Sequence, residues 1–233
     1  MSMVCHEFRT PLAVIDGNAQ GIIKRRETIS PDKLMGRLGK VRVSVRRLTE
    51  LMESVLSASK LEAGSIAMNP APCNLASMID EVAANYREVN PTYDIAVDTA
   101  DLPESFVADV KLIRQVVSNL LSNAVKYSPD GAYVSIDART NDDGGVAIAV
   151  RDEGVGIPED ELKKLFQRFF RASTSTGIAG TGIGLHMVQA LVDMHGGRID
   201  VASDVGVGTT FTVCLPPRDH VVAPDCDDIV DAA

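Results

Sequence analysis

Apolar residues in the first quarter of the chain recur at alternating steps of four and three, the spacing of a narrow helical seam. The two series are Phe8, Leu12, Ile15, Ala19 and Ile22, and then Leu34, Leu38, Val41, Val45, Leu48, Met52 and Val55. Ser30-Pro31-Asp32 between them is a helix-start signal. A short link predicts an antiparallel hairpin, and two narrow seams alone bury little apolar surface. We therefore expect a homodimer through residues 1–66 that forms a four-helix bundle, with a single hairpin packed on the rest of the chain as the alternative.

After residue 66 the pattern changes to that of a mixed α/β domain. Asn69-Pro70-Ala71-Pro72 predicts a short, stiff linker over residues 67–72. The expected helices cover residues 75–89, 109–126, 158–170 and 183–194, and the expected strands cover 94–98, 133–138, 146–150, 198–202 and 209–215. These elements predict an α+β chain, in which the hairpin precedes a layered α/β sandwich over residues 73–217. Residues 218–233 hold five Asp and one Arg, and we expect a disordered acidic tail there.

Composition excludes several classes of protein. Aromatic residues make up only 4% of the 233 residues and Trp is absent, which argues against a single-strand nucleic-acid binder built on aromatic platforms. No apolar run is long enough for a membrane segment, and the first ten residues lack the apolar stretch of a signal peptide. The chain has four widely spaced cysteines and no CxxC pair; they are Cys5, Cys73, Cys214 and Cys226. This spacing argues against a zinc site and against a disulfide scaffold, so we expect a reducing, cytoplasmic location.

Charge is distributed unevenly between the two parts of the chain. Residues 1–66 carry 11 Lys and Arg against 7 Asp and Glu, a net charge of +4, and the remainder carries 12 against 25, a net charge of −13. An acidic chain is a poor non-specific binder of nucleic acid, so no nucleic-acid partner is expected. The basic first segment suits an acidic protein partner.

The first candidate site lies near the N-terminus. His6 occupies an outward position in the frame set by Phe8 and Leu12, beside Glu7 and one turn from Thr10. A neutral imidazole has one nitrogen free to attack while a carboxylate holds the other. Taken without the rest of the chain, an ordinary surface histidine is the better interpretation of this cluster.

The second candidate lies on one face of the helix expected over residues 109–126. Asn119 and Asn123 are one turn apart, and Lys126 and Tyr127 follow on the next turn. Two amide oxygens near an ammonium group suit a Mg²⁺ ion held against phosphates. The alternative is a polar helix face, although two Asn within a helix call for some other reason.

Two glycine-containing loops complete the candidates. Asp152 follows the strand over residues 146–150, where a carboxylate can accept a hydrogen bond from the exocyclic amine that adenine offers. The alternative is an Asp that caps a turn. Gly180, Gly182 and Gly184 open a helix whose backbone N–H groups favour an anion. This turn does not follow a strand, so it fails the context of a dinucleotide-binding motif.

The order of these clusters resembles the signature boxes of two-component sensor histidine kinases. The boxes are His-Glu-Phe-Arg-Thr-Pro-Leu (6–12), Asn-Leu-Leu-Ser-Asn-Ala-Val-Lys-Tyr-Ser (119–128), Asp-Glu-Gly-Val-Gly-Ile-Pro (152–158), Phe-Gln-Arg-Phe-Phe-Arg (166–171), Gly-Thr-Gly-Ile-Gly-Leu (180–185) and Gly-Val-Gly-Thr (206–209). The resemblance covers nearly everything from Cys5 to Pro217. It implies a dimerisation and phosphoacceptor hairpin followed by an ATP-binding domain of the Bergerat type.

The resemblance also implies roles for single residues. His6 would be the phosphoacceptor, Glu7 its base or orienting partner, and Thr10 the residue that places water when a partner is dephosphorylated. Asn123 would ligate Mg²⁺ with Asn119 beside it. The residues implied in ATP binding are Asn119, Asn123, Lys126, Tyr127, Asp152, Gly154, Gly156, Ile157, Arg171, Gly180, Thr181, Gly182, Gly184, Leu185 and Thr209. Phe166, Phe169 and Phe170 would anchor a mobile lid over residues 171–181.

The implied reaction is autophosphorylation of His6 by ATP and Mg²⁺, followed by transfer to an aspartate in the receiver domain of a response regulator. The chain departs from the family pattern at Cys5, where a serine is usual, and at His186, where a small residue is usual. Only five residues precede His6, which suggests an excised core or input from a separate protein.

Four alternatives remain. They are a phosphatase-biased regulator of the same partner, an ATPase of the gyrase and chaperone class, a scaffold without turnover, and a DNA-binding hairpin.

Overall fold

The computed structural model describes residues 3–62, 65–129, 132–178 and 180–217. The chain divides into two compact units. One comprises Met1–Ile66, Lys164–Arg171 and Ala179–Met187, and the other comprises Ala67–Lys163, Ala172–Ile178 and Val188–Ala233. The expected acidic tail over residues 218–233 lies outside the described residues.

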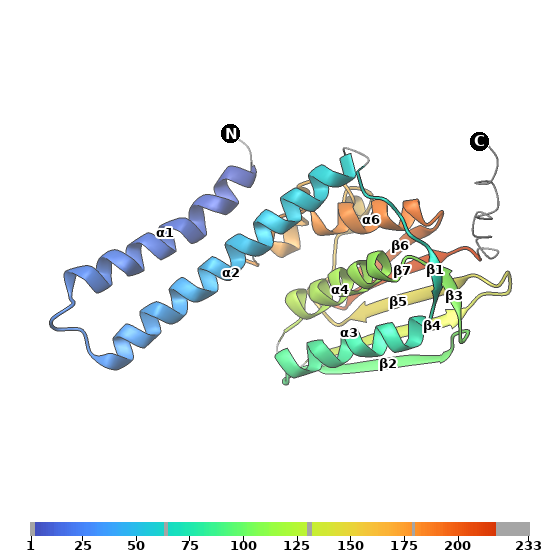
Figure 1. Ribbon diagram of the computed structural model, residues 1–233, viewed down its shortest axis with the longest axis horizontal. Coiled ribbons are helices and arrows are strands. Elements are labelled where there is room, and N and C mark those ends of the chain that lie inside the picture. Colours follow the sequence, from blue (N-terminus) through green and yellow to red (C-terminus); the bar gives the residue numbers. More distant parts are fainter. Residues whose placement is uncertain (1–2, 63–64, 130–131, 179, 218–233) are drawn as a thin grey trace, which may run out of the picture. The chain divides into compact units, whose positions relative to one another are not determined.

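The N-terminal hairpin consists of α1 (Met3–Lys24) and α2 (Pro31–Glu62), which run antiparallel along each other (Figure 1). Pro31 and Asp32 open α2 as the sequence predicts, because proline fits the first helical position and an acidic residue interacts favourably with the positive end of the helix dipole. Among the described side chains of these two helices, those of Pro11, Ser44 and Leu51 are buried. The helical hairpin is therefore confirmed.

The predicted seam of α2 divides into two sets. Every second member, Leu34, Val41, Leu48 and Val55, is half-buried. The alternate members, Leu38, Val45 and Met52, have exposed fractions of 46%, 49% and 50%. The hairpin therefore covers one edge of its seam and leaves an apolar stripe, Leu38, Val45 and Met52, open at intervals of seven residues.

The second unit contains a five-stranded sheet in the order β2-β4-β5-β7-β6. The strands are β2 (Asp94–Asp101), β4 (Tyr133–Thr140), β5 (Val146–Asp152), β6 (Arg198–Asp204) and β7 (Gly208–Leu215). Only β2 and β4 pair in parallel, and the other pairs are antiparallel. The inward residues of β4 and β5 are mostly Val and Ile, which suits strands that bury one face.

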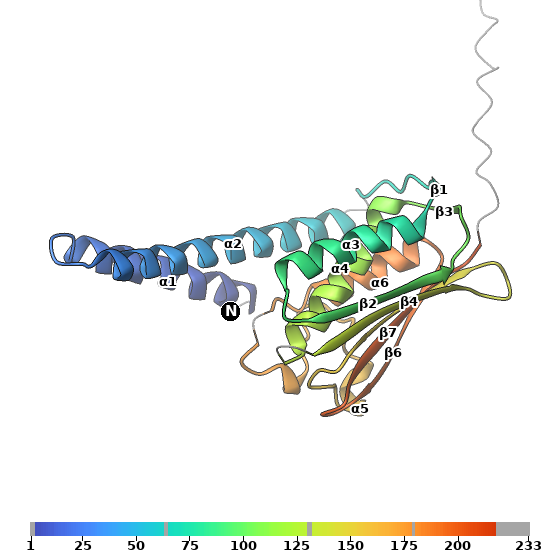
Figure 2. The ribbon, with the colours of Figure 1, turned by 90° about the horizontal axis from the view of Figure 1, so that it is seen from below.

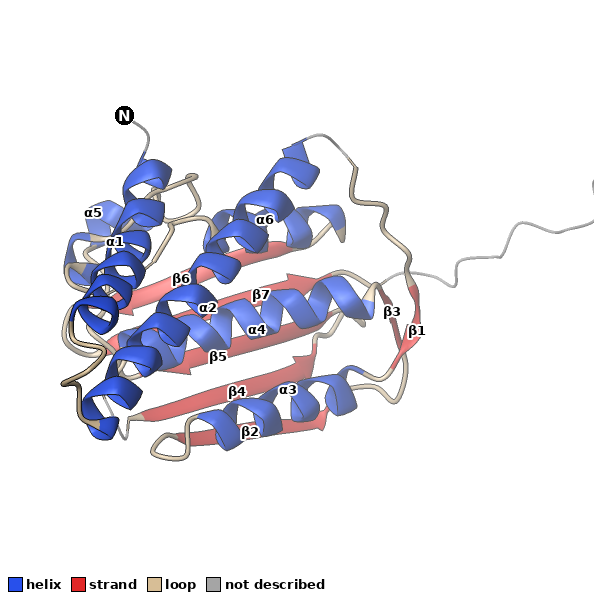
Figure 3. Ribbon diagram, turned by 60° about the vertical axis from the view of Figure 1, so that its left-hand side comes forward, coloured by secondary structure: helices blue, strands red, loops and turns tan. Residues whose placement is uncertain are grey.

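Helices cover one face of this sheet. They are α3 (Leu75–Val89), α4 (Val110–Tyr127) and residues 188–194 of α6 (Gly184–Met194), as Figures 2 and 3 show. The side chain of Asn74 caps α3 and that of Asp109 caps α4. The core between helices and sheet consists of aliphatic side chains that are almost fully buried, among them Ile79, Ile113, Leu120, Leu121, Ile136, Ile148 and Leu191. The layered α/β domain is confirmed.

Two parts of the chain after residue 66 differ from the expectation. Residues 71–72, expected in the linker, begin β1 (Ala71–Cys73), which pairs with β3 (Phe106–Ala108). Neither strand is evident from the sequence, because three residues are too few to show a period. The helix expected over residues 158–170 is wrong beyond its first turn: α5 (Glu159–Leu162) is followed by turns, in which Phe169 N donates to the carbonyl of Gly182. That tertiary hydrogen bond replaces the helical pattern.

Candidate functional site

Asp152 ends β5 as a buried carboxylate with two unequal oxygens. Its side chain is only 6% exposed, and Oδ1 accepts hydrogen bonds from Gly154 N at 2.8 Å and Thr209 N at 3.3 Å. Oδ2 accepts none from the described residues. Burial raises the pKa of Asp152 to about 6, and the two backbone N–H groups offset only part of this shift. The site thus holds one acceptor oxygen that is oriented but not used.

The loop after Asp152 needs glycine for a steric reason. A Cβ atom on Gly154 would lie 2.6 Å from both Asp152 Oδ1 and the carbonyl oxygen of Tyr127. Gly156 has φ +67°, and a Cβ atom there would collide with the carbonyl of Asp204. The backbone at Gly154 therefore lies directly against the Asp152 carboxylate, and the backbone at Gly156 lies against Asp204.

Ser203 on β6 holds this loop, and sequence reasoning missed it. Its Oγ accepts from Ile157 N at 2.9 Å, donates to Gly208 O at 2.8 Å and lies 2.9 Å from Thr209 Oγ1. Thr209 is buried, and its backbone N–H group is the one that contacts Asp152. A serine at an edge strand carries no motif, so nothing in the sequence distinguishes Ser203 from a surface residue.

The polar face of α4 belongs to the same unit. Asn119 and Asn123 are half-buried, and neither side chain makes a hydrogen bond to another described residue. Lys126 Nζ donates to Tyr127 Oη at 3.0 Å and lies 4.5 Å from the centre of the Tyr127 ring. The Tyr127 carbonyl accepts from Val155 N at 3.1 Å. This hydrogen bond joins the end of α4 to the loop that follows Asp152.

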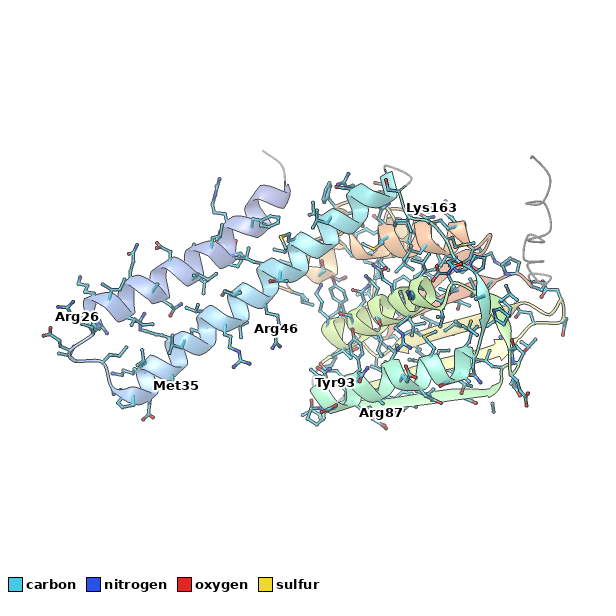
Figure 4. The ribbon with its side chains drawn as sticks, in the orientation of Figure 1. Arg26, Met35, Arg46, Arg87, Tyr93 and Lys163 are labelled. Atoms are coloured by element: carbon cyan, nitrogen blue, oxygen red, sulfur yellow. The ribbon has the colours of Figure 1, made fainter. Side chains whose placement is uncertain are left out.

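Two tyrosines and a buried histidine position α4. Tyr86 donates from its hydroxyl to Ser118 O at 3.0 Å, and Tyr93 donates to Ser128 O at 3.2 Å. Tyr93 lies beyond the end of α3, near Arg87 (Figure 4). At the other end, His195 is 2% exposed, and its Nε2 accepts from Asp109 N at 3.2 Å. The helix expected over residues 183–194 ends just before His195, and the buried partner of His195 cannot be inferred from spacing.

The glycine-rich turn (residues 180–185) and the phenylalanine segment (residues 166–171) belong to the unit that contains the hairpin. Phe169 N donates to Gly182 O at 2.8 Å. Gly182 has φ +67°, and a Cβ atom there would lie 2.6 Å from Phe170 O. Phe169 itself has φ +67°, an uncommon conformation for a residue with a side chain. Thr181 Oγ1 accepts from Ile183 N at 3.2 Å. Six of the residues implied in ATP binding lie within this cluster or next to it in the sequence: Arg171, Gly180, Thr181, Gly182, Gly184 and Leu185.

The three residues predicted for phosphotransfer lie in α1. His6 and Glu7 are helical, and their side chains lie outside the described part of the structure. Thr10 is exposed one turn later.

Among the described helices, none is both long and apolar enough to cross a membrane.

Two family models match the chain. Residues 1–64 match the His Kinase A (phospho-acceptor) domain, and residues 108–219 match the histidine kinase-, DNA gyrase B- and HSP90-like ATPase family. Together they cover most of the chain. The HisKA match argues against a gyrase- or chaperone-type ATPase, in which a phospho-acceptor domain has no use.

Similar proteins are sensor kinases. The sensor protein SrrB of Staphylococcus aureus is 29% identical over 221 residues, which are 91% of this chain and 37% of SrrB. Full-length ShkA, solved in complex with AMPPNP, is 26% identical with a TM-score of 0.69 over 92% of this chain and 45% of that one. ThkA in complex with the response regulator protein TrrA shares the fold, with 23% identity and a TM-score of 0.71 over 92% of this chain and 60% of that one. The chain spans little more than a third of the length of its SrrB relatives.

Proposed function

The chain belongs to the sensor histidine kinases, and from that premise we propose that it is an ATP-dependent protein-histidine kinase core that phosphorylates its own His6. The observation that carries the proposal is the buried carboxylate of Asp152, whose Oδ2 accepts no hydrogen bond from the described residues. The exocyclic amine of adenine would fill this position. Guanine presents a carbonyl at the corresponding edge, which would face the carboxylate unfavourably.

The polar face of α4 fits a nucleotide triphosphate with its cation. Asn119 and Asn123 offer amide oxygens that no described residue engages, and oxygen ligands are those that Mg²⁺ prefers. When bound, Mg²⁺ offsets charge on the β- and γ-phosphates. Lys126, already held by the Tyr127 hydroxyl, would add a positive charge on the same helix. Catalysis would then rest mainly on placement and electrostatics.

The transfer step exchanges one bond to phosphorus for another. A ring nitrogen of His6 attacks the γ-phosphorus in line, an N–P bond forms, and the bond from phosphorus to the ADP oxygen breaks. Glu7 holds or accepts the proton on the other ring nitrogen. The phosphohistidine then passes the phosphoryl group to an aspartate of a response regulator. The linker after residue 66 would let the ATP-binding domain approach His6.

The partners follow from charge and from the uncovered stripe. The net charge of +4 on residues 1–66 suits an acidic receiver domain, and ThkA offers a precedent for a complex with a response regulator. The stripe formed by Leu38, Val45 and Met52 supports a homodimer through the hairpin. Use of ATP and the free thiols of Cys73 and Cys214 favour a cytoplasmic location.

The proposal is tested by incubating the purified chain with γ-labelled ATP and Mg²⁺. We expect label that survives alkali and is lost in acid, as phosphohistidine requires. His6→Gln should abolish labelling and leave ATP binding intact, because the adenine site and His6 lie in different units. Label that persists on the His6→Gln chain would refute His6 as acceptor.

A phosphorylated response regulator forms the second arm of this experiment. If the chain binds ATP without becoming labelled and instead removes phosphate from the regulator, the phosphatase alternative replaces the kinase proposal. Thr10, exposed one turn after His6, would then be the first residue to substitute.

A further inference from the structure

The side chain of His186, in the first turn of α6, makes one hydrogen bond to a described residue. Its Nδ1 lies 3.1 Å from the carbonyl oxygen of Phe166, and the ring is half-buried. A carbonyl oxygen only accepts, so the proton must be on Nδ1. Among the described residues no other group hydrogen-bonds to this ring. The imidazole is therefore oriented by the phenylalanine segment.

A second hydrogen bond joins the same two stretches of chain. Phe169 N donates to Gly182 O at 2.8 Å, and the backbone of Gly182 lies against Phe169 and Phe170 without room for a Cβ atom. The two bonds pair residues 166 and 169 with residues 186 and 182. The glycine-rich turn at the start of α6 is thus attached at both ends to the same segment, residues 166–169.

This arrangement matters because the turn is intrinsically soft. Gly180, Gly182 and Gly184 give the backbone wide conformational freedom, whereas a set of N–H groups binds phosphate well only when their directions are fixed in advance. Phe169, at φ +67°, keeps its strained conformation only where its surroundings impose it. A side chain that ties the start of α6 to Phe166 supplies such a restraint.

We propose that His186 is a positioning residue that holds the glycine-rich turn in the conformation in which it meets the phosphates of ATP. The inference rests on the proposed function. It assigns to His186 a role in substrate affinity and none in proton transfer, because its one hydrogen bond is to a backbone carbonyl.

Three substitutions separate this role from general structural support. His186→Ala removes the hydrogen bond. His186→Asn places an amide N–H group near the position of Nδ1 and can restore the bond to Phe166. His186→Gln places its amide near the position of Nε2 and cannot. Gln189→Ala is the matched control, because Gln189 lies one turn further along α6, is also half-buried and has a side chain that makes no hydrogen bond to a described residue.

The measurement is the rate of self-labelling as a function of ATP concentration. For His186→Ala we expect the KM for ATP to rise about three- to tenfold, the effect of losing one neutral hydrogen bond, with the rate at saturating ATP changed less than about twofold. His186→Asn should recover most of the affinity. His186→Gln should resemble His186→Ala, and Gln189→Ala should resemble the wild type. Equal KM values for wild type and His186→Ala would overturn the inference, as would failure of Asn to rescue.

Ring-nitrogen NMR provides a test that does not depend on activity. At mildly alkaline pH the wild-type chain should show a protonated Nδ1 and a bare Nε2 for His186, with the signals assigned by their loss in His186→Asn. The opposite tautomer would overturn the proposal. If the wild type takes up no label, the proposed kinase activity fails, and the Kd values of the same variants for AMPPNP still decide whether His186 serves nucleotide affinity.

Discussion

Asp152 shows how its own backbone neighbours prepare a single side chain for a ligand. Two N–H groups, from Gly154 and Thr209, fix one carboxylate oxygen and leave the other to accept a hydrogen bond. Ser203 and Gly156 fix the loops that supply those groups. The proposed recognition of a base at this site would therefore depend on one acceptor oxygen whose direction the fold sets.

Substituting Asp152→Asn should weaken ATP far more than GTP. The amide oxygen would keep the two backbone N–H groups, and the NH₂ group would then face the adenine amine, donor against donor. We expect ATP affinity to fall about 10- to 100-fold, since a hydrogen bond to a charged group is lost and a repulsive contact replaces it. The measurement is a competition titration with both nucleotides. Equal losses for ATP and GTP would contradict adenine recognition by Asp152.

The residues that the sequence singles out and those that it does not differ in a physical way. Asp152, Asn123 and the glycines stand in ordered motifs, so their spacing along the chain is informative. Ser203 and His195 act through partners 46 and 86 residues distant along the chain, and such contacts leave no local pattern. His186 is recognisable as unusual, but its hydrogen bond to Phe166 depends on how two turns pack.

Whether a helix or strand could be predicted depended on how many repeats of its apolar pattern it contains. Strands of seven or eight residues and helices of eleven or more are evident in the sequence, because each shows several turns of its pattern. β1 and β3, with three residues each, show none. The failed helix after Leu162 has helical composition, yet hydrogen bonds to a distant turn determine its path.

The apolar stripe of α2 leads to a prediction about assembly. Val45→Glu places a charge between Leu38 and Met52 and should convert the dimer to a monomer at micromolar concentration, because a buried unpaired carboxylate is costly. Light scattering measures the mass. Val43→Glu is the control: Val43 is 71% exposed and lies off the stripe, so its variant should stay dimeric. A wild-type monomer, or equal dissociation of both variants, would count against dimerisation through this stripe.

For the molecule as a whole, the two units should respond to different ligands. Asp152, Asn119 and Asn123 share one unit with the sheet, whereas the stripe belongs to the hairpin. Binding of the adenine base should therefore act on the unit with the sheet and self-association on the hairpin, and the glycine-rich turn belongs to the same unit as the hairpin. The opposite net charges of the two parts of the sequence, +4 and −13, fit this division of roles.

Calorimetry can separate these equilibria. AMPPNP at about 100 times its Kd should stabilise the unit with Asp152 by about 2.7 kcal/mol and raise its transition temperature. Raising the protein concentration should shift the hairpin transition instead. One transition that moves equally with nucleotide and with protein concentration would show that the units unfold together.

The buried carboxylate of Asp152 should also make the proposed nucleotide binding a proton-linked event. In the empty site the pKa of Asp152 is about 6, and an amine that donates to Oδ2 favours the charged form and lowers the pKa. Near pH 6, nucleotide binding should therefore release a fraction of a proton into the solvent, and affinity should decline as pH falls through that range. Titration calorimetry in buffers of different ionisation enthalpy would register this release. A kinase core built this way would couple its occupancy by ATP to the acidity of its surroundings.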